Sequence, residues 1–243
     1  MTDIKGFYRT KAVLGTVNVV LALLLLFLVG RYMHTQQKVK EVTERETEVG
    51  NVAALEQETK KEIALTFDDG PHYAYTEVLL DGLLERNVKA TFFVTGEHAS
   101  LHPELVRRMY REGHVVGNHT YSHMQLKSDN QEQFKEELLL TNEILKEIGV
   151  EEIVFVRPPY GSWDKELEKE LEIIPVLWTV DPLDWCSGSV REIVDKTLSE
   201  TEEGSIILLH DYFENSVEAA LQIVDALLEQ GYCFVTVEEL LFD

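Results

Sequence analysis

Residues 61–243 alternate between short apolar runs and longer segments whose apolar positions recur every three or four residues. The short runs predict strands at 62–67, 90–95, 114–118, 153–156, 173–180, 205–209 and 232–236. The periodic segments predict amphipathic helices at 76–86, 103–112, 131–148, 190–200 and 216–230. Gly113, Gly149 and Gly231 stand where helix C-caps are expected.

Strands that alternate with helices predict a parallel sheet with helices outside it. The predicted strands are apolar on both faces, as buried parallel strands are. Seven such units favour a barrel-like α/β fold over an open sheet, although periodicity alone does not decide between the two. The pattern shows no internal repeat and no low-complexity tract.

An uncharged apolar run at residues 12–30 precedes this domain. Its nineteen residues are just long enough, as a helix, to span a bilayer. Lys5, Arg9 and Lys11 favour a cytoplasmic N-terminus, and no small-residue cleavage site follows the run. We expect an uncleaved anchor, with a cleaved signal peptide as the alternative.

These expectations divide the chain into four parts and place it in the cell membrane as a single-pass protein. The parts are a cytoplasmic N-terminus at 1–11, a transmembrane signal anchor at 12–30, a polar stalk at 31–60 and an extracytoplasmic domain at 61–243. The stalk is rich in charged and polar residues and has no apolar stripe that needs a core.

The charge of the chain restricts its partners. The formal net charge is −22, and residues 1–40 hold six bases against one acid, so the remainder carries −27. Such a domain is repelled by nucleic acid phosphates and by anionic surfaces or polymers, whereas a neutral or cationic polymer fits better. The two cysteines, Cys186 and Cys233, exclude a disulfide framework and a cysteine zinc site. We expect both to be buried, and a bond between them stays open.

Two carboxylates, Asp68 and Asp69, follow the first predicted strand directly and precede Gly70 and Pro71. Adjacent acids at the end of a buried strand are unfavourable without a cation or strong hydrogen bonds. A divalent metal is one reason to keep them, and a simple turn is the alternative. Because successive side chains leave a strand in different directions, one aspartate can bind a metal while the other has another role.

His119 and His123 follow the strand at 114–118. Histidines four residues apart lie on one face of a helix, close enough to hold one ion. With Asp69 they form a set that leaves a position open for water, as catalytic metal sites do, although it also suits iron oxygenases. The other histidines are expected to be structural or exposed, namely His34, His72, His98, His102 and His114.

Three more predicted strands are followed by polar or aromatic residues. These are Arg157 to Tyr160, Asp184 with Trp185, and His210. Two prolines stiffen the first of these loops, so it is either a rigid turn or a support for a backbone N–H aimed at an oxyanion. In barrels built from βα units, the C-terminal ends of the strands form the active-site face.

Five ordered motifs resemble those of the polysaccharide deacetylases, carbohydrate esterase family 4, which include chitin-oligosaccharide and peptidoglycan deacetylases. They are TFDDG at 66–70, HTYSH at 119–123, RPPY at 157–160, DW at 184–185 and LLH at 208–210. The resemblance covers residues 61–243 and implies a distorted (β/α) barrel of about seven parallel strands. Together with the N-terminal run, it implies an α/β enzyme preceded by one transmembrane helix.

The resemblance also implies roles for the acidic and histidine residues. Asp68 would be the general base, oriented by Arg157. Asp69, His119 and His123 would bind a divalent metal. Zinc is expected from the ligand types, and cobalt or nickel are alternatives.

The remaining motif residues would complete the site. Tyr160 would direct its backbone N–H at the oxyanion, and His210 would be the general acid that protonates the leaving amine. Asp184 would pair either with the motif arginine or with His210, which the sequence leaves open. Trp185 and Leu208 would form walls for the sugar and the acetyl methyl group.

The function that the resemblance implies is removal of N-acetyl groups from a glycan that contains N-acetylglucosamine. The predicted anchor favours peptidoglycan, outside the cell and near the membrane. Two alternatives stay open: an O-acetyl esterase of the xylan type, which uses the same machinery, and an inactive glycan-binding protein with the same fold. The expected partners are thus an acetylated glycan and the membrane, and no nucleic acid.

Overall fold

The structure is a computed structural model that describes residues 31, 33–34, 36–38, 40 and 61–242. The chain divides into residues 1–59 and 60–243, and the described residues of the first part are helical and exposed. Among the described residues, no helix is long and apolar enough to cross a bilayer. The predicted anchor at 12–30 lies outside the described residues, so it stays a prediction.

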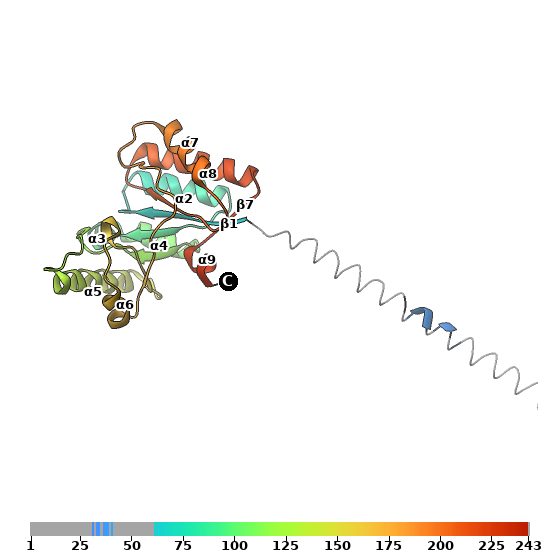
Figure 1. The fold of residues 1–243 in the computed structure, drawn as a ribbon, viewed down its shortest axis with the longest axis horizontal. Helices are drawn as coiled ribbons and strands as arrows, with labels where there is room; N and C mark the ends of the chain where they lie inside the picture. Colours follow the sequence, from blue (N-terminus) through green and yellow to red (C-terminus); the bar gives the residue numbers. More distant parts are fainter. Residues whose placement is uncertain (1–30, 32, 35, 39, 41–60, 243) are drawn as a thin grey trace, which may run out of the picture. The chain divides into compact units, whose positions relative to one another are not determined.

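The described residues of the second part form a parallel sheet of seven strands (Figure 1). The strands are β1 (Lys61–Asp68), β2 (Thr91–Val94), β3 (Val115–Asn118), β4 (Phe155–Val156), β5 (Ile174–Pro175), β6 (Ile206–His210) and β7 (Tyr232–Val235). Their order is β5-β4-β3-β2-β1-β6, and β7 pairs with the first half of β1. The parallel α/β fold is therefore confirmed, as a half-barrel.

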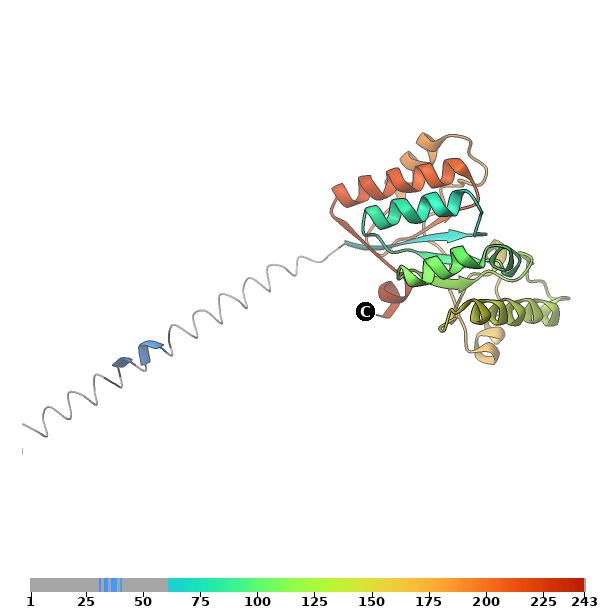
Figure 2. The same cartoon turned by 180° about the vertical axis from the view of Figure 1, so that it is seen from behind.

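The five predicted helices are confirmed within two residues at each end. They are α2 (Tyr75–Glu85), α4 (Pro103–Arg111), α5 (Gln131–Ile148), α7 (Val190–Glu200) and α8 (Glu214–Glu229). Helix α8 packs against α2 and α7, and α5 packs against α4 (Figure 2). Gly113, Gly149 and Gly231 have φ values of 84°, 107° and 82°, as expected for residues that end helices.

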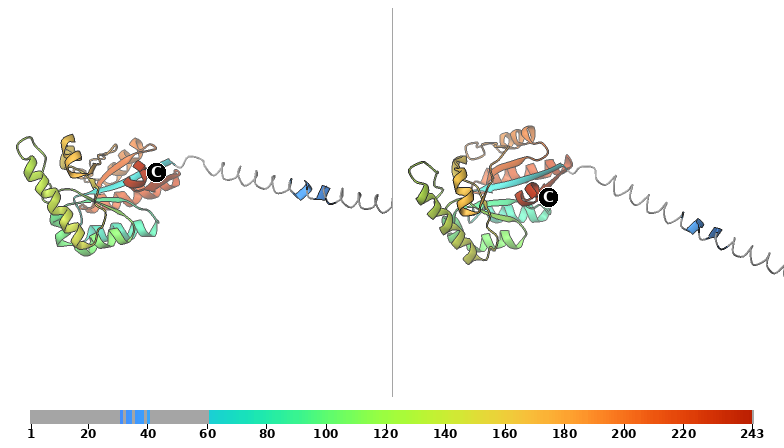
Figure 3. Two further views of the ribbon diagram at one scale, coloured as in Figure 1. Left: turned by 90° about the horizontal axis from the view of Figure 1, so that it is seen from below. Right: turned by 60° about the horizontal axis from the view of Figure 1, so that its bottom comes forward.

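Four short elements were not predicted, because each is too short to show a helical period. They are α3 (Gly96–Leu101), the 3₁₀ turn η1 (Pro159–Gly161), α6 (Lys165–Leu171) and α9 (Val237–Phe242). Helix α9 packs on β1 and β7, so the end of the chain returns to the first strand (Figure 3).

Two sequence predictions were wrong. The strand expected at 173–180 is reduced to β5, because its only partner among the described strands, β4, ends at Val156, and Val180 makes only an isolated bridge to Ile207. Cys186 was expected to be buried and is exposed, while Cys233 is partly buried. Both thiols are free, so no disulfide joins them.

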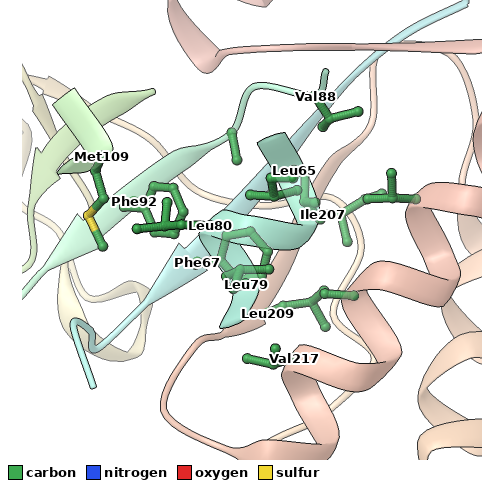
Figure 4. Packing of buried hydrophobic residues seen from close by; sticks show 14 of the residues in the cluster. Leu65, Phe67, Leu79, Leu80, Val88, Phe92, Met109, Ile207, Leu209 and Val217 are labelled. Carbon is green, nitrogen blue, oxygen red and sulfur yellow. The ribbon is translucent and has the colours of Figure 1, made fainter. Parts of the chain in front are cut away.

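The alternation of side chains along β1 separates the core from the site. Leu65 and Phe67 pack beneath the helices with Leu79 of α2 and Leu209 of β6 (Figure 4). The intervening residues of β1 point to the opposite face of the sheet, since side chains alternate along a strand. Those residues are Ala64, Thr66 and Asp68, which are also buried. The polar side chains of Thr66 and Asp68 are thus directed into the half-barrel.

Candidate active site

The C-terminal ends of neighbouring strands bring the predicted site residues together. Asp68, the last residue of β1, pairs in register with His210, the last residue of β6. On the other side, Asn118 of β3 pairs with Val156 of β4, which sets the following residues, His119 and Arg157, side by side. This is the strand-end face on which the sequence predicted the site.

A cluster of three possible metal ligands lies on this face. Asp69 Oδ1 is 3.4 Å from His119 Nε2 and 3.3 Å from His123 Nε2. His119 Nδ1–H donates to the carbonyl of Arg157 at 2.6 Å, which leaves Nε2 free to bind an ion. Asp69 Oδ1 is buried without a hydrogen-bond partner in the described part of the chain. An orphaned carboxylate oxygen between two imidazoles fits a divalent cation.

The two histidines are brought together by a bend of the chain and not by a helix, the one arrangement for which their spacing was considered. Residues 119–123 are not helical, and Thr120 and His123 have φ values of 63° and 59°. Asn118 fixes this bend, because its Oδ1 accepts from the N–H of Thr120 at 2.8 Å. The Asn118 amide in turn donates to the carbonyl of Leu138 at 2.8 Å, so helix α5 supports the loop.

Asp68 is held by a buried arginine. Arg157 Nη1 donates to Asp68 Oδ1 at 2.8 Å and to the Thr66 hydroxyl at 2.7 Å. The Thr66 hydroxyl donates to the carbonyl of Ile207 at 2.7 Å. Arg157 is fully buried, and its remaining nitrogens donate to backbone carbonyls at 3.0 and 3.2 Å. Because all three nitrogens of the guanidinium donate hydrogen bonds, the arginine holds the aspartate in one orientation.

His210 pairs with Asp184, which answers the question that the sequence left open. His210 Nδ1–H donates to Asp184 Oδ1 at 2.8 Å, and the backbone N–H of His210 donates to Asp184 Oδ2 at 2.8 Å. Burial lowers the pKa of His210, but the hydrogen bond and charge of Asp184 outweigh it and raise that pKa to about 9. The other nitrogen, Nε2, lies 4.0 Å from Asp69 Oδ2.

The remaining predicted residues surround this centre. Tyr160 has a φ of 59°, is 67% exposed, and its ring centre lies 4.8 Å from that of His123. Trp185 is 54% exposed, so its side chain is open to solvent. Leu208 is 4% exposed and lies within β6.

A groove that the sequence did not predict lies beside the cluster of possible metal ligands. It has a volume of about 360 Å³, and Asp69 and His123 lie in its wall beside His98, Tyr212 and Phe213. His98 Nδ1–H donates to the carbonyl of Asp69 at 2.6 Å, and its ring stacks on Tyr212 with centres 5.2 Å apart. His98 was expected to be structural or exposed, and no spacing in the sequence links it to Asp69.

Thr66 was not singled out as a site residue either. It lies in an apolar run, where a single hydroxyl gives little signal. Thr66 stands two residues before Asp68, and because side chains alternate along a strand, both lie on the same face of β1. This spacing is the signal in the sequence that could have assigned Thr66 to the site.

Comparisons with known proteins agree with this geometry. Residues 56–176 match the family model described as polysaccharide deacetylase. A peptidoglycan-N-acetylglucosamine deacetylase of Bacillus cereus is 41% identical over 184 residues, 73% of this chain and 67% of that protein. The peptidoglycan-N-acetylmuramic acid deacetylase PdaC of Bacillus subtilis is 40% identical over 181 residues, 74% of this chain and 39% of that protein.

Solved structures show the same fold. The structure of PdaC superposes with a TM-score of 0.73 and 40% identity, over 75% of this chain and 90% of that chain. A carbohydrate esterase family 4 pseudoenzyme from Bacillus anthracis superposes with a TM-score of 0.70 and 25% identity, over 75% of this chain and 66% of that chain. Family membership alone therefore does not imply catalysis. The sequence and structural matches together show that this chain belongs to the polysaccharide deacetylases of carbohydrate esterase family 4, a family of hydrolases.

Proposed function

We propose that the protein is a metal-dependent deacetylase that removes N-acetyl groups from a glycan containing N-acetylglucosamine, with peptidoglycan as the preferred substrate. One observation carries the proposal. The cluster of Asp69, His119 and His123 lies between a carboxylate held by Arg157 and an imidazole held by Asp184. A base and an acid on either side of a metal site are the groups that hydrolysis of an amide needs.

The donor set suits zinc first, and cobalt or nickel as alternatives. A divalent cation held by Asp69, His119 and His123 would supply Lewis acidity toward the acetyl carbonyl and toward the attacking water. His119 is already fixed in the tautomer that binding requires, by its bond to the carbonyl of Arg157 at 2.6 Å.

The residues around the cluster then divide the proton transfers. Asp68, held by Arg157, accepts a proton from the attacking water. The backbone N–H of Tyr160 donates to the oxygen that gains charge when the acetyl carbon becomes tetrahedral. His210 has Nδ1–H committed to Asp184, so it delivers its proton to the leaving amine from Nε2.

The state of His210 favours an amide over an ester as the bond that is cleaved. An amine is a poor leaving group until its nitrogen is protonated, whereas an ester oxygen needs less help. The hydrogen bond and charge of Asp184 raise the pKa of His210 to about 9, which favours the protonated form of the imidazole. The same intact acid, base and ligand set supports an active enzyme over an inactive glycan-binding protein.

The test is acetate release by the full chain from chitin oligomers of increasing length, peptidoglycan fragments and acetylated xylan. We expect release from the first two, with peptidoglycan fragments preferred, and the products should carry new primary amines. The groove beside the cluster has room for a neighbouring sugar, so longer oligomers should react faster than short ones. Release from xylan alone would identify an esterase, and no release from any substrate would favour the inactive alternative.

Removal of the metal is expected to abolish deacetylation and to lower the melting temperature, because an ion that binds only the folded state stabilises it. His119→Ala and His123→Ala should each weaken zinc binding. His102→Ala is the matched control, because His102 lies outside the ligand cluster. Calorimetric titration with Zn²⁺ and a melting curve in chelator measure both effects. Full activity in a thoroughly chelated sample would exclude the metal mechanism.

We also propose that residues 12–30 anchor the protein in the cell membrane, with the catalytic domain outside the cytoplasm. The support is the uncharged run and the absence of a cleavage site after it. Fractionated cells should hold the full-length chain in the membrane, with residues 61–243 open to protease added from outside. A soluble product that begins near residue 31 would show cleavage instead.

A further inference from the structure

The turn that carries Asp69, the proposed carboxylate ligand of the metal, has an unfavourable backbone conformation. Asp69 has a φ of 72°, in the left-handed region that residues other than glycine seldom adopt. A residue in this region persists only where the surrounding structure fixes it. What fixes Asp69 therefore decides where its carboxylate lies.

Two hydrogen bonds hold the turn, one from Thr95 at the start of α3 and one from His98 within α3. The N–H of Thr95 donates to the carbonyl of Gly70 at 3.2 Å. His98 Nδ1–H donates to the carbonyl of Asp69 at 2.6 Å. Both bonds act on carbonyl groups, so neither of them occupies the space beside the Cα of Gly70.

Asp211, which follows β6, lies beside Gly70 of this turn. Asp211 is completely buried, and its Oδ2 accepts a hydrogen bond from the hydroxyl of Thr76 in α2. The Thr76 oxygen accepts in turn from the N–H of His72 at 2.8 Å. Oδ1 has no hydrogen-bond partner among the described residues. Burial, with the nearby charge of Asp69, raises the pKa of Asp211 to about 7, so this carboxyl is not an ordinary surface acid.

The carboxyl of Asp211 fills the space beside Gly70. A Cβ added to Gly70 would lie 2.2 Å from Asp211 Oδ1 and 2.3 Å from Oδ2, and the three nearest atoms all belong to that carboxyl. Gly70 itself lies outside the left-handed region, so its backbone would accept a side chain. A glycine is required at position 70 because a larger side chain would clash with the carboxyl of Asp211, and not because of its backbone conformation.

We infer that Asp211 is a positioning residue of the metal site, whose carboxyl, anchored by Thr76, packs against Gly70 and fixes the adjacent Asp69. The inference rests on the proposed role of Asp69 as a ligand. Asp211 acts through the turn and does not contact the reacting atoms. None of the five family-like motifs contains it, because the last of them ends at His210.

The test is the Zn²⁺ affinity of the full chain, titrated well below the melting temperature of each variant. Gly70→Ala should weaken binding by about 10–100-fold, the usual effect of disturbing the support of a ligand, and Asp211→Ala by about tenfold. The double variant Gly70→Ala/Asp211→Ala should bind at least about tenfold more tightly than Gly70→Ala, because the added methyl group then has room. If the fold-losses in zinc affinity of the two single variants multiply in the double variant, the two residues act independently and the inference is overturned.

Three further variants separate positioning from general destabilisation. Gly188→Ala is the matched control and should bind zinc like the parent, because no described atom lies within 4 Å of the added Cβ. Asp211→Asn keeps the volume and the acceptor for Thr76, so it should retain affinity within about threefold of the parent, whereas Thr76→Val should weaken it. Parent-like zinc affinity in both Asp211→Ala and Thr76→Val would overturn the inference even if Gly70→Ala fails to fold. If the parent protein binds no zinc, the proposed metal site is wrong. If the parent binds zinc but the effects of Gly70→Ala and Asp211→Ala on its affinity are independent, only the proposed role of Asp211 is wrong.

Discussion

Asp68→Asn is expected to keep the bound metal and to lose about 10²–10⁴-fold in the rate of deacetylation, the usual contribution of a positioned general base. Asp69→Asn is expected to lose metal affinity and rate together. The difference follows from the geometry, because Arg157 holds Asp68 at 2.8 Å, while Asp69 Oδ1 lies between two histidines. Metal content and acetate release, measured on both variants, give the result.

Asp129→Asn serves as the matched control, since Asp129 is exposed in a loop before α5 and should change neither quantity. An amide is nearly the size of a carboxylate, so lost packing does not account for a large effect. Equal metal loss in the two variants, or a fully active Asp68→Asn enzyme, would contradict the separate roles of these neighbours.

Loss of the general acid is expected to have an effect of similar size. His210→Ala should lower the rate by about 10²–10⁴-fold. In the parent enzyme, activity should fall as the pH rises past the point where His210 loses its proton. Asp184 raises this pKa to about 9, and a bound cation would repel the same charge, so the alkaline limb should lie at or below pH 9.

Asp184→Asn removes the charge that sustains the imidazolium, so the alkaline limb should move toward neutral pH. The same raised pKa means that the charged pair stabilises the folded state below the ordinary histidine pKa of 6.5 and loses this effect as pH rises through about 9. Rate and melting temperature against pH, for the parent and Asp184→Asn, test both statements. An alkaline limb that stays in place in the variant would show that another group is the acid.

Much of the fold could be predicted from local pattern. The apolar runs marked six of the seven described strands closely, because buried parallel strands need side chains that are apolar on both faces. The fifth strand was overestimated, since the apolar run continues in the sequence beyond the point where its partner strand, β4, ends at Val156. Short elements such as α6 and α9 escaped prediction because fewer than two helical turns give no clear period.

The site could be predicted in part for a related reason. Polar residues directly after apolar runs fall at strand ends, so Asp69, His119 and His210 were assigned to one face before any distance was known. Which strands are neighbours is set by packing between distant parts of the chain, and Thr66 and Ile207, which share a hydrogen bond, are 141 residues apart. The pairing of Asp184 with His210 and the contact of His98 with Asp69 both depend on such packing between separate segments.

The in-register pairing of Asp68 with His210 bears on how such an enzyme can diverge. Adjacent strands in a sheet lie about 4.8 Å apart, a distance that backbone hydrogen bonds fix. The spacing between Asp68 and His210, to which we assign the proton transfers, is therefore set by the ladder itself, and insertions elsewhere leave it unchanged. The side chains of Tyr160 and Trp185 lie on loops outside this ladder and are not fixed by it. Substitution of these two side chains can therefore change which sugar is bound, while the backbone N–H of Tyr160 and the pairing of Asp68 with His210 are kept.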